Sequence, residues 1–162
     1  MKLAKTLSLP AFALATGFAT VVLPGLAQAD GHSAMAEYGT MQITKSPTCG
    51  CCAGWAELAR AEGYDVEITD TADVSAAKID VGVPDQLWAC HTTEVAGYVI
   101  EGHVPFEAVA QLLEERPDIA GIAVPGMPGG SPGMGDDPNA RFDVIAFGGD
   151  AEVGEVFYQA GL

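Results

Sequence analysis

The feature that most constrains this chain is a run of closely spaced cysteines, Cys49-Gly50-Cys51-Cys52, between a strand-like and a helix-like stretch. Residues 41–45 alternate apolar and polar side chains, which predicts a short strand. After the cysteines, apolar side chains recur at helical spacing up to Gly63, which predicts a helix that begins at the thiols. Backbone N–H groups and the helix dipole favour an anion at that end, so these thiols are expected to form thiolates readily.

The stretches that follow predict a mixed α/β fold. Residues 64–69 alternate again, residues 73–80 form a short helical stretch, and residues 91–101 have the pattern of a strand–turn–strand hairpin. A helical stripe then starts near Pro105 and stops before Pro117. The resulting order, β-α-β-α-β-β-α, is that of a thioredoxin-like fold, in which a parallel βαβ unit precedes an antiparallel hairpin.

A C-terminal extension follows this core. It contains a Gly/Pro-rich loop with Met127 and Met134, and short strands are expected at 142–147 and 153–158. The predicted organisation is a signal peptide at 1–29, a flexible arm at 30–39, a thioredoxin-like domain at 40–117 and a metal-loop extension at 118–162.

Residues 1–29 have the pattern of a secretory signal peptide. Two lysines precede an apolar run, and Ala27 and Ala29 are the small residues of a cleavage site, so cleavage is expected after Ala29. A membrane anchor is the alternative, but Pro10 and Gly17 interrupt the run. We therefore expect the mature chain in a bacterial periplasm.

The charge of the chain excludes two classes of partner. Lys and Arg total 7 and Asp and Glu total 22, which gives a formal charge of −15. Binding of a polyanion needs basic side chains that displace counterions, so no nucleic acid partner is expected. An anionic membrane surface is disfavoured for the same reason, and we expect no membrane partner after signal cleavage.

The cysteines allow several interpretations. In an oxidising compartment, four cysteines predict two structural disulfides, but Cys51 and Cys52 are adjacent and cannot pair without strain. Cys49 and Cys52 have the C-x-x-C spacing of thiol–disulfide oxidoreductases, for which they would be the catalytic pair. Structural zinc and an iron–sulfur cluster are further options, although the spacing matches neither well.

Additional residues favour copper among the soft metals. A thioredoxin-like topology would bring Cys90 and His91, at the start of the third strand, close to the first helix. Thiolates and thioethers select Cu(I), zinc or iron–sulfur, and thioether is a poor zinc ligand. Met127 and Met134 thus favour copper, and His103 is a further candidate ligand. The histidines could instead be satisfied core or surface residues, and the methionines plain loop residues.

Several segments together resemble the CopG family of periplasmic copper-resistance proteins, also known as domain-of-unknown-function family 411. These segments are KSPTCGCC at 45–52, CHT at 90–92, GYVIEGHVP at 97–105, RPDIAG at 116–121, VPGMP at 124–128 and GSPGM at 130–134. They fall within residues 40–147, which make up most of the mature chain.

This resemblance implies a thioredoxin-like domain whose C-terminal extension helps to bind metal. It implies a multinuclear, cysteine-bridged copper cluster and interconversion of Cu(I) and Cu(II) during detoxification, by a possible copper oxidoreductase. The matching metal ligands are Cys49, Cys51, Cys52, Cys90, His91, Met127 and Met134, and His103 stays a further candidate ligand. We expect a monomer that receives copper from, or passes it to, a periplasmic efflux system or chaperone. A passive copper buffer and a metal-free thiol–disulfide oxidoreductase remain the alternatives.

Overall fold

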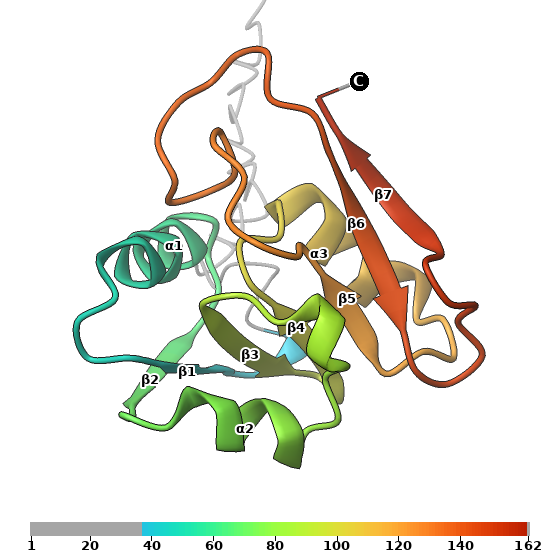
Figure 1. The fold of residues 1–162 in the computed structure, drawn as a ribbon, viewed down its shortest axis with the longest axis horizontal. Coiled ribbons are helices and arrows are strands. Elements are labelled where there is room, and N and C mark those ends of the chain that lie inside the picture. Colours follow the sequence, from blue (N-terminus) through green and yellow to red (C-terminus); the bar gives the residue numbers. More distant parts are fainter. Residues whose placement is uncertain (1–36, 162) are drawn as a thin grey trace, which may run out of the picture. The chain divides into compact units, whose positions relative to one another are not determined.

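The computed structural model describes residues 37–161. The predicted signal peptide at 1–29, its cleavage site and residues 30–36 of the predicted arm lie outside the described residues. The described part is a mixed α/β fold with three α-helices and seven strands. In chain order the elements are β1 (Met41–Lys45), α1 (Gly50–Ala61), β2 (Val66–Asp70), α2 (Val74–Asp80), the 3-10 helix η2 (Asp85–Leu87), β3 (His91–Val95), β4 (Tyr98–Glu101), α3 (Phe106–Glu115), β5 (Gly121–Ala123), β6 (Phe142–Phe147) and β7 (Val156–Ala160) (Figure 1).

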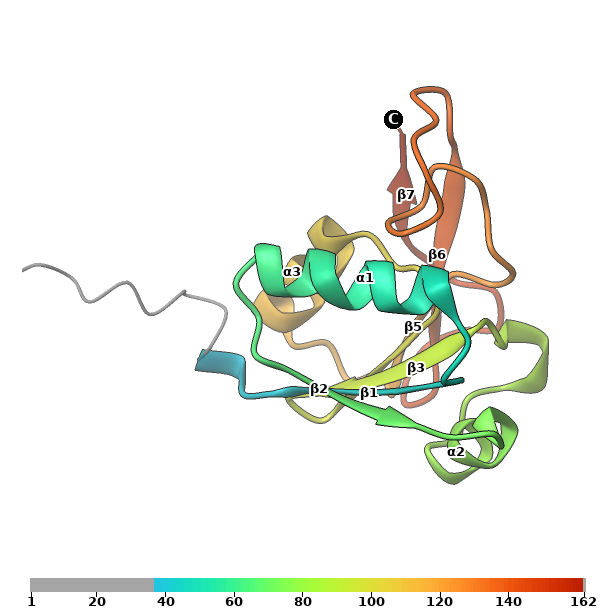
Figure 2. The same cartoon turned by 90° about the vertical axis from the view of Figure 1, so that its left-hand side faces the viewer.

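All seven strands form one sheet, in the order β2-β1-β3-β4-β5-β6-β7. β1 pairs with β2 in parallel and with β3 in antiparallel orientation, and β3 and β4 form an antiparallel hairpin. Helices α1 and α3 cover one face of the sheet and α2 lies on the other (Figure 2). This arrangement places the beginning of α1 beside the beginning of β3.

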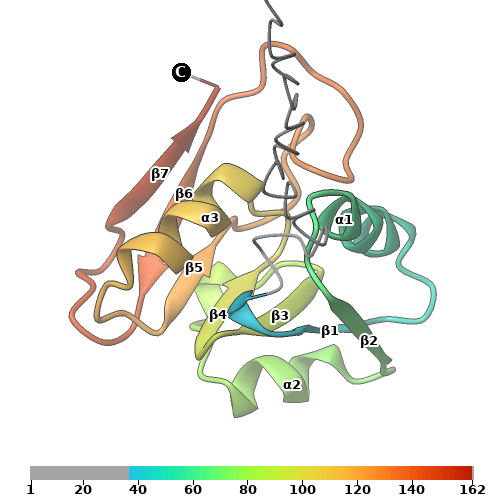
Figure 3. The ribbon, with the colours of Figure 1, turned by 180° about the vertical axis from the view of Figure 1, so that it is seen from behind.

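The C-terminal extension continues the same sheet. β5 pairs in parallel with β4, and β6 and β7 follow in antiparallel orientation, as the view from behind shows (Figure 3). The strand expected at 142–147 is confirmed, and the one expected at 153–158 begins later, at Val156. β5 was not expected from the sequence. Its Gly121 lies so close to Val99 that a Cβ atom there would collide with the Val99 carbonyl oxygen.

The main core lies between the sheet and the pair α1 and α3. Trp55 of α1 is fully buried, stacks on Phe106 at 5.0 Å between ring centroids, and donates its indole N–H to the Val104 carbonyl at 2.9 Å. This hydrogen bond ties α1 to the segment that follows β4. Among the described residues, no helix has the length and apolar character needed to cross a bilayer.

Candidate metal centre

The N-terminal end of α1 presents three of the four cysteines. Cys49 is the N-cap residue, and its Sγ accepts a hydrogen bond from the Cys52 backbone N–H at 3.3 Å. The Cys49 backbone N–H itself donates to the Ser46 carbonyl at 3.0 Å, which closes the turn between β1 and α1. The turn therefore holds the thiols at the positive end of the helix dipole.

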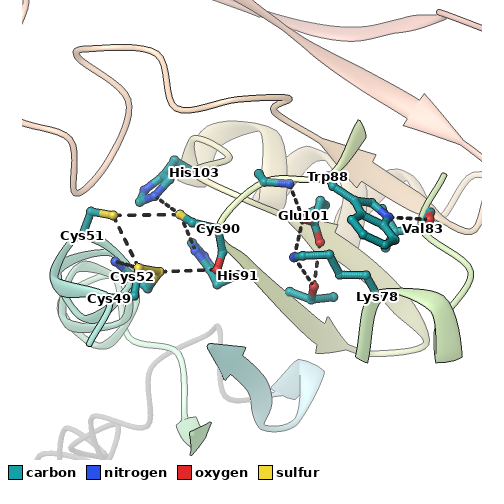
Figure 4. A network of polar contacts seen from close by, with 12 residues as sticks. Cys49, Cys51, Cys52, Lys78, Val83, Trp88, Cys90, His91, Glu101 and His103 are labelled. Carbon is teal, nitrogen blue, oxygen red and sulfur yellow. Dashed lines mark hydrogen bonds and ion pairs between the residues drawn. A yellow bond between two sulfur atoms is a disulfide. The ribbon is translucent and has the colours of Figure 1, made fainter. Parts of the chain in front are cut away.

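Of the four cysteines, two form a disulfide and two are free. Cys49 and Cys52 form a disulfide, with their Cα atoms 5.4 Å apart, which is within the usual range for such a bridge. Cys51 and Cys90 are free and partly buried. The Cys51 Sγ lies 3.5 Å from the Cys49 Sγ and 3.9 Å from the Cys90 Sγ, so all four sulfur atoms gather at this end of α1 (Figure 4).

Cys90 contacts a buried histidine on its other side. The Cys90 Sγ is 2.8 Å from His103 Nε2, and His103 Nδ1 is 2.7 Å from the Pro132 carbonyl. A carbonyl oxygen only accepts hydrogen bonds, so Nδ1 carries the proton and donates it to Pro132. The lone pair of Nε2 then faces the Cys90 sulfur, in the arrangement by which a backbone carbonyl orients a metal-binding histidine.

Burial keeps this pair neutral in the absence of metal. Burial, followed by the neighbouring Cys51, raises the pKa of the Cys90 thiol to about 12. Burial also lowers the pKa of His103, against the opposing effect of the Pro132 carbonyl. A neutral S–H group therefore faces a neutral imidazole nitrogen. A bound cation would favour the deprotonated form of Cys90 instead, because it stabilises the thiolate.

His91 is the third member of this group. It is fully buried, and its ring centroid lies 5.0 Å from those of Trp55 and His103. Its Nδ1 is 3.7 Å from the Cys90 Sγ, and its Nε2 has no hydrogen-bond partner among the residues that the structure describes. Burial, followed by the positive charge that His103 would carry, lowers the pKa of His91 to about 3. It is a neutral imidazole with an unused polar atom.

The loop between β5 and β6 closes over the end of α1. A Cβ atom at Gly133 would lie 2.7 Å from the Cys51 carbonyl oxygen and 2.9 Å from the Trp55 nitrogen, so only glycine allows this approach. Met134 comes next in the chain and is partly buried, whereas Met127 has 54% of its surface exposed. The structure thus brings the backbone at Gly133, the residue before Met134, against the first turns of α1, and both methionines stay predicted ligands.

The predicted cysteines and histidines are brought together in two overlapping groups. One group contains the four cysteine sulfur atoms, and the other contains Cys90, His91 and His103, with the ligand atoms of each group within 4.8 Å of one another. Cys90 belongs to both groups. Such a set of sulfur and imidazole nitrogen atoms suits a soft or borderline metal ion.

Sequence patterns did not identify a buried polar network next to Cys90. Lys78 of α2 and Glu101 of β4 form an ion pair at 2.6 Å, and the side chain of Glu101 is fully buried (Figure 4). The one signal in the sequence is a glutamate at the end of the apolar strand YVIE, at 98–101. The Pro132 carbonyl that orients His103 was also missed, since a backbone contact has no residue signature.

Comparison with known proteins finds one matching family model and similar solved structures of a copper-resistance protein. A family model described as a protein of unknown function, DUF411, matches residues 87–134. Form 1 of copper resistance protein CopG is 36% identical, with a TM-score of 0.66, and the match covers 74% of this chain and 95% of that one. Form 2 is 35% identical with a TM-score of 0.67, and the match covers 74% and 96%. No curated protein matches the sequence.

Proposed function

The chain belongs to the CopG family of copper-resistance proteins, and from this premise we propose that it binds copper ions at the N-terminal end of α1. The observation that carries the proposal is the position of Cys90. This residue is 38 positions or more away in sequence from the other cysteines, yet its sulfur lies 3.9 Å from the Cys51 sulfur and 2.8 Å from a histidine nitrogen.

We further propose a thioredoxin-like core, a multinuclear copper site and a periplasmic location. The strand order β2-β1-β3-β4, with a parallel βαβ unit and an antiparallel hairpin, supports a thioredoxin-like core. The sharing of Cys90 by two groups of ligands supports a multinuclear site, because a thiolate sulfur can bridge two copper ions. The pattern at 1–29 supports a periplasmic location. We further propose that the chain is a monomer and that it exchanges copper with an efflux system or a chaperone.

The proposed ligands are the residues predicted from the sequence. Cys51 and Cys90 offer free thiols, and His103 and His91 offer neutral imidazole nitrogens. Cys49 and Cys52 can bind copper only after their disulfide is reduced, because a disulfide sulfur carries no thiolate charge. Met127 and Met134 would complete the coordination from the loop that covers the site.

Cys49 and Cys52 also give the site a route to change the oxidation state of copper. Each thiolate can donate one electron to one Cu(II) ion, which yields two Cu(I) ions and the Cys49–Cys52 disulfide. The chain would then reduce copper, and an external thiol reductant would restore the dithiol. The soft thiolates of Cys51 and Cys90 would retain the Cu(I) product.

Metal analysis of the purified mature protein tests this function. Reduced protein is expected to bind more copper per chain than protein with an intact Cys49–Cys52 disulfide, since it has four thiols instead of two. Optical and EPR spectra under air and under reductant would report the oxidation state. Protein that retains no copper in either state would contradict the proposal, and copper fixed in one oxidation state would favour a passive buffer.

The Cys49–Cys52 disulfide favours a second candidate, a metal-free thiol–disulfide oxidoreductase. The variant Cys51→Ser separates the two functions, because it leaves that pair intact and removes a free thiol from the cluster. The copper function predicts weaker copper binding in this variant. The oxidoreductase predicts an insulin-reduction activity that the substitution does not change.

A further inference from the structure

We propose that Glu101 is a positioning residue that fixes the Cys90 thiol against His103, an inference that rests on the proposed copper function. Glu101 does not contact the proposed ligands directly. It holds the backbone immediately before Cys90, together with Lys78 and Thr92. We call Lys78, Thr92, Glu101 and the Ala89 backbone N–H the buried network.

The contacts of the buried network are short and cover both carboxylate oxygens. Glu101 Oε1 accepts from Lys78 Nζ at 2.6 Å and from the Ala89 backbone N–H at 2.6 Å. Glu101 Oε2 accepts from the Thr92 hydroxyl at 2.6 Å, and that hydroxyl accepts from Lys78 Nζ at 3.0 Å. The carboxylate is therefore fixed in orientation, and the Ala89 N–H is fixed with it.

The network links the two segments that carry the proposed ligands. Ala89 directly precedes Cys90, at the start of β3, and Glu101 stands two residues before His103, at the end of β4. The Gly102 N–H also donates to the His91 carbonyl at 2.9 Å, and Gly102 has no room for a Cβ atom beside Ala89. One carboxylate thus sets the spacing between the two segments that place Cys90 and His103 in contact.

Fold stability alone does not account for a buried ion pair at this position. Replacing such a pair by apolar side chains of similar size is often neutral or stabilising, because two charges no longer have to leave water. Lys78 and Glu101 are among the least exposed charged residues of the described chain, with side-chain exposures of 3% and 0%. A role in holding the Ala89 N–H would explain why a buried ion pair is present beside Cys90.

Two double variants separate positioning from stability. Lys78→Met/Glu101→Gln removes both charges but keeps an amide oxygen that can accept from the Ala89 N–H. Lys78→Met/Glu101→Leu removes both charges and the acceptor. We expect the Gln variant to bind copper like the original chain and the Leu variant to lose affinity about tenfold or more, with a shifted copper spectrum. Equal affinity and an equal spectrum in the Leu variant would overturn the proposal.

A core variant controls for general destabilisation. Val144→Ala removes buried volume from β6, outside the buried network, and its thermal midpoint can be compared with that of the Leu variant. We expect Val144→Ala to leave the copper spectrum unchanged. A similar spectral shift in this variant would overturn the assignment to Glu101. If the Leu variant does not fold, Lys78→Met/Glu101→Met takes its place in the same comparison.

A copper-free measurement keeps this inference distinct from the proposed function. In a Cys51→Ser background with the Cys49–Cys52 disulfide intact, Cys90 is the remaining free thiol of the sequence. Its alkylation by iodoacetamide should be several-fold faster in the Leu variant than in the Gln variant, because the unanchored segment exposes the sulfur. Equal alkylation rates would overturn the positioning role, whereas failure to bind copper would contradict only the proposed function.

Discussion

At the scale of single residues, His103 joins two parts of the chain that are far apart in sequence. Its Nδ1 donates to Pro132 in the loop between β5 and β6, and its Nε2 faces Cys90 at the start of β3. Both contacts depend on one tautomer, because only a protonated Nδ1 can donate to the carbonyl. The loop therefore determines which nitrogen of His103 is available to a metal ion.

Replacing His103 tests this link. We expect His103→Phe to lower the copper affinity about tenfold or more, since the ring is retained but the nitrogen lone pair is lost. Competition with a chromophoric Cu(I) chelator measures the effect. Thr93→Val is the control, because Thr93 is buried on β3 and its hydroxyl has no partner among the described residues. Unchanged affinity in His103→Phe would exclude this side chain as a ligand.

His91 predicts an acid sensitivity of the metal-free protein. Burial lowers its pKa to about 3, whereas an unfolded chain has the ordinary value of about 6.5. Between these values the unfolded state binds more protons, so the free energy of unfolding falls as the pH falls through this window. The contribution is at most about 1.4 kcal/mol per pH unit, and it vanishes above about pH 6.5.

The variant His91→Gln should remove this contribution. Urea unfolding at several pH values between 4 and 7 measures the slope in both proteins, and the carboxylates contribute similarly to each. We expect the difference in stability between variant and original chain to change with pH below 6.5 and to be constant above it. A difference that stays constant across the whole range would show that His91 is not buried as a neutral group.

At the scale of elements, the docking of the loop on α1 depends on the conformation of Gly133. Its φ of +83° lies in the left-handed region that side chains disfavour, and a Cβ atom would press against the Cys51 carbonyl oxygen at 2.7 Å. Gly135 has nearly the same φ, +84°, but nothing lies within 4 Å of its Cβ position. The two glycines therefore share the same backbone conformation but differ in whether a side chain would have space.

Substitution of each glycine by alanine separates backbone strain from lost docking. Both variants carry the same left-handed penalty of roughly 1–2 kcal/mol. We expect Gly133→Ala to lose at least about 1 kcal/mol more than Gly135→Ala, and to weaken copper binding, because the loop is pushed away from His103. Thermal unfolding and chelator competition measure the two effects. Equal losses would show that the loop does not need close contact with α1.

The sequence predicted most elements but not the contacts between them. The strand at 41–45 alternates apolar and polar side chains, and the hairpin at 91–101 has a clear turn at Ala96-Gly97. The structure has both at the expected residues. β5 was missed because three residues carry too little periodicity to distinguish a strand from a loop. The convergence of Cys90 with the other cysteines was expected from the topology, whereas the buried network joins α2 to β4 through charges that no local pattern reveals.

At the scale of the whole molecule, one continuous sheet supports the candidate site and its covering loop. β3 and β4 lead to Cys90 and His103, and β5 and β6 carry the loop that supplies the Pro132 carbonyl. Residues of the extension are also part of the main core, including Ile122, Val124 and Val144. The extension should therefore be needed for folding as well as for the site.

Two truncations test this dependence. A chain that ends at Pro117 loses Ile122, Val124 and Val144, which are at most 1% exposed. Burial of such a side chain contributes about 1.5–3 kcal/mol, so their loss consumes much of a typical stability of about 5–15 kcal/mol. We expect this chain to lack cooperative unfolding. A chain that ends at Ala151 keeps β6 and loses the half-exposed β7, and it should unfold cooperatively and bind copper. Cooperative unfolding of the shorter chain, followed by circular dichroism, would show that residues 40–117 fold without the extension.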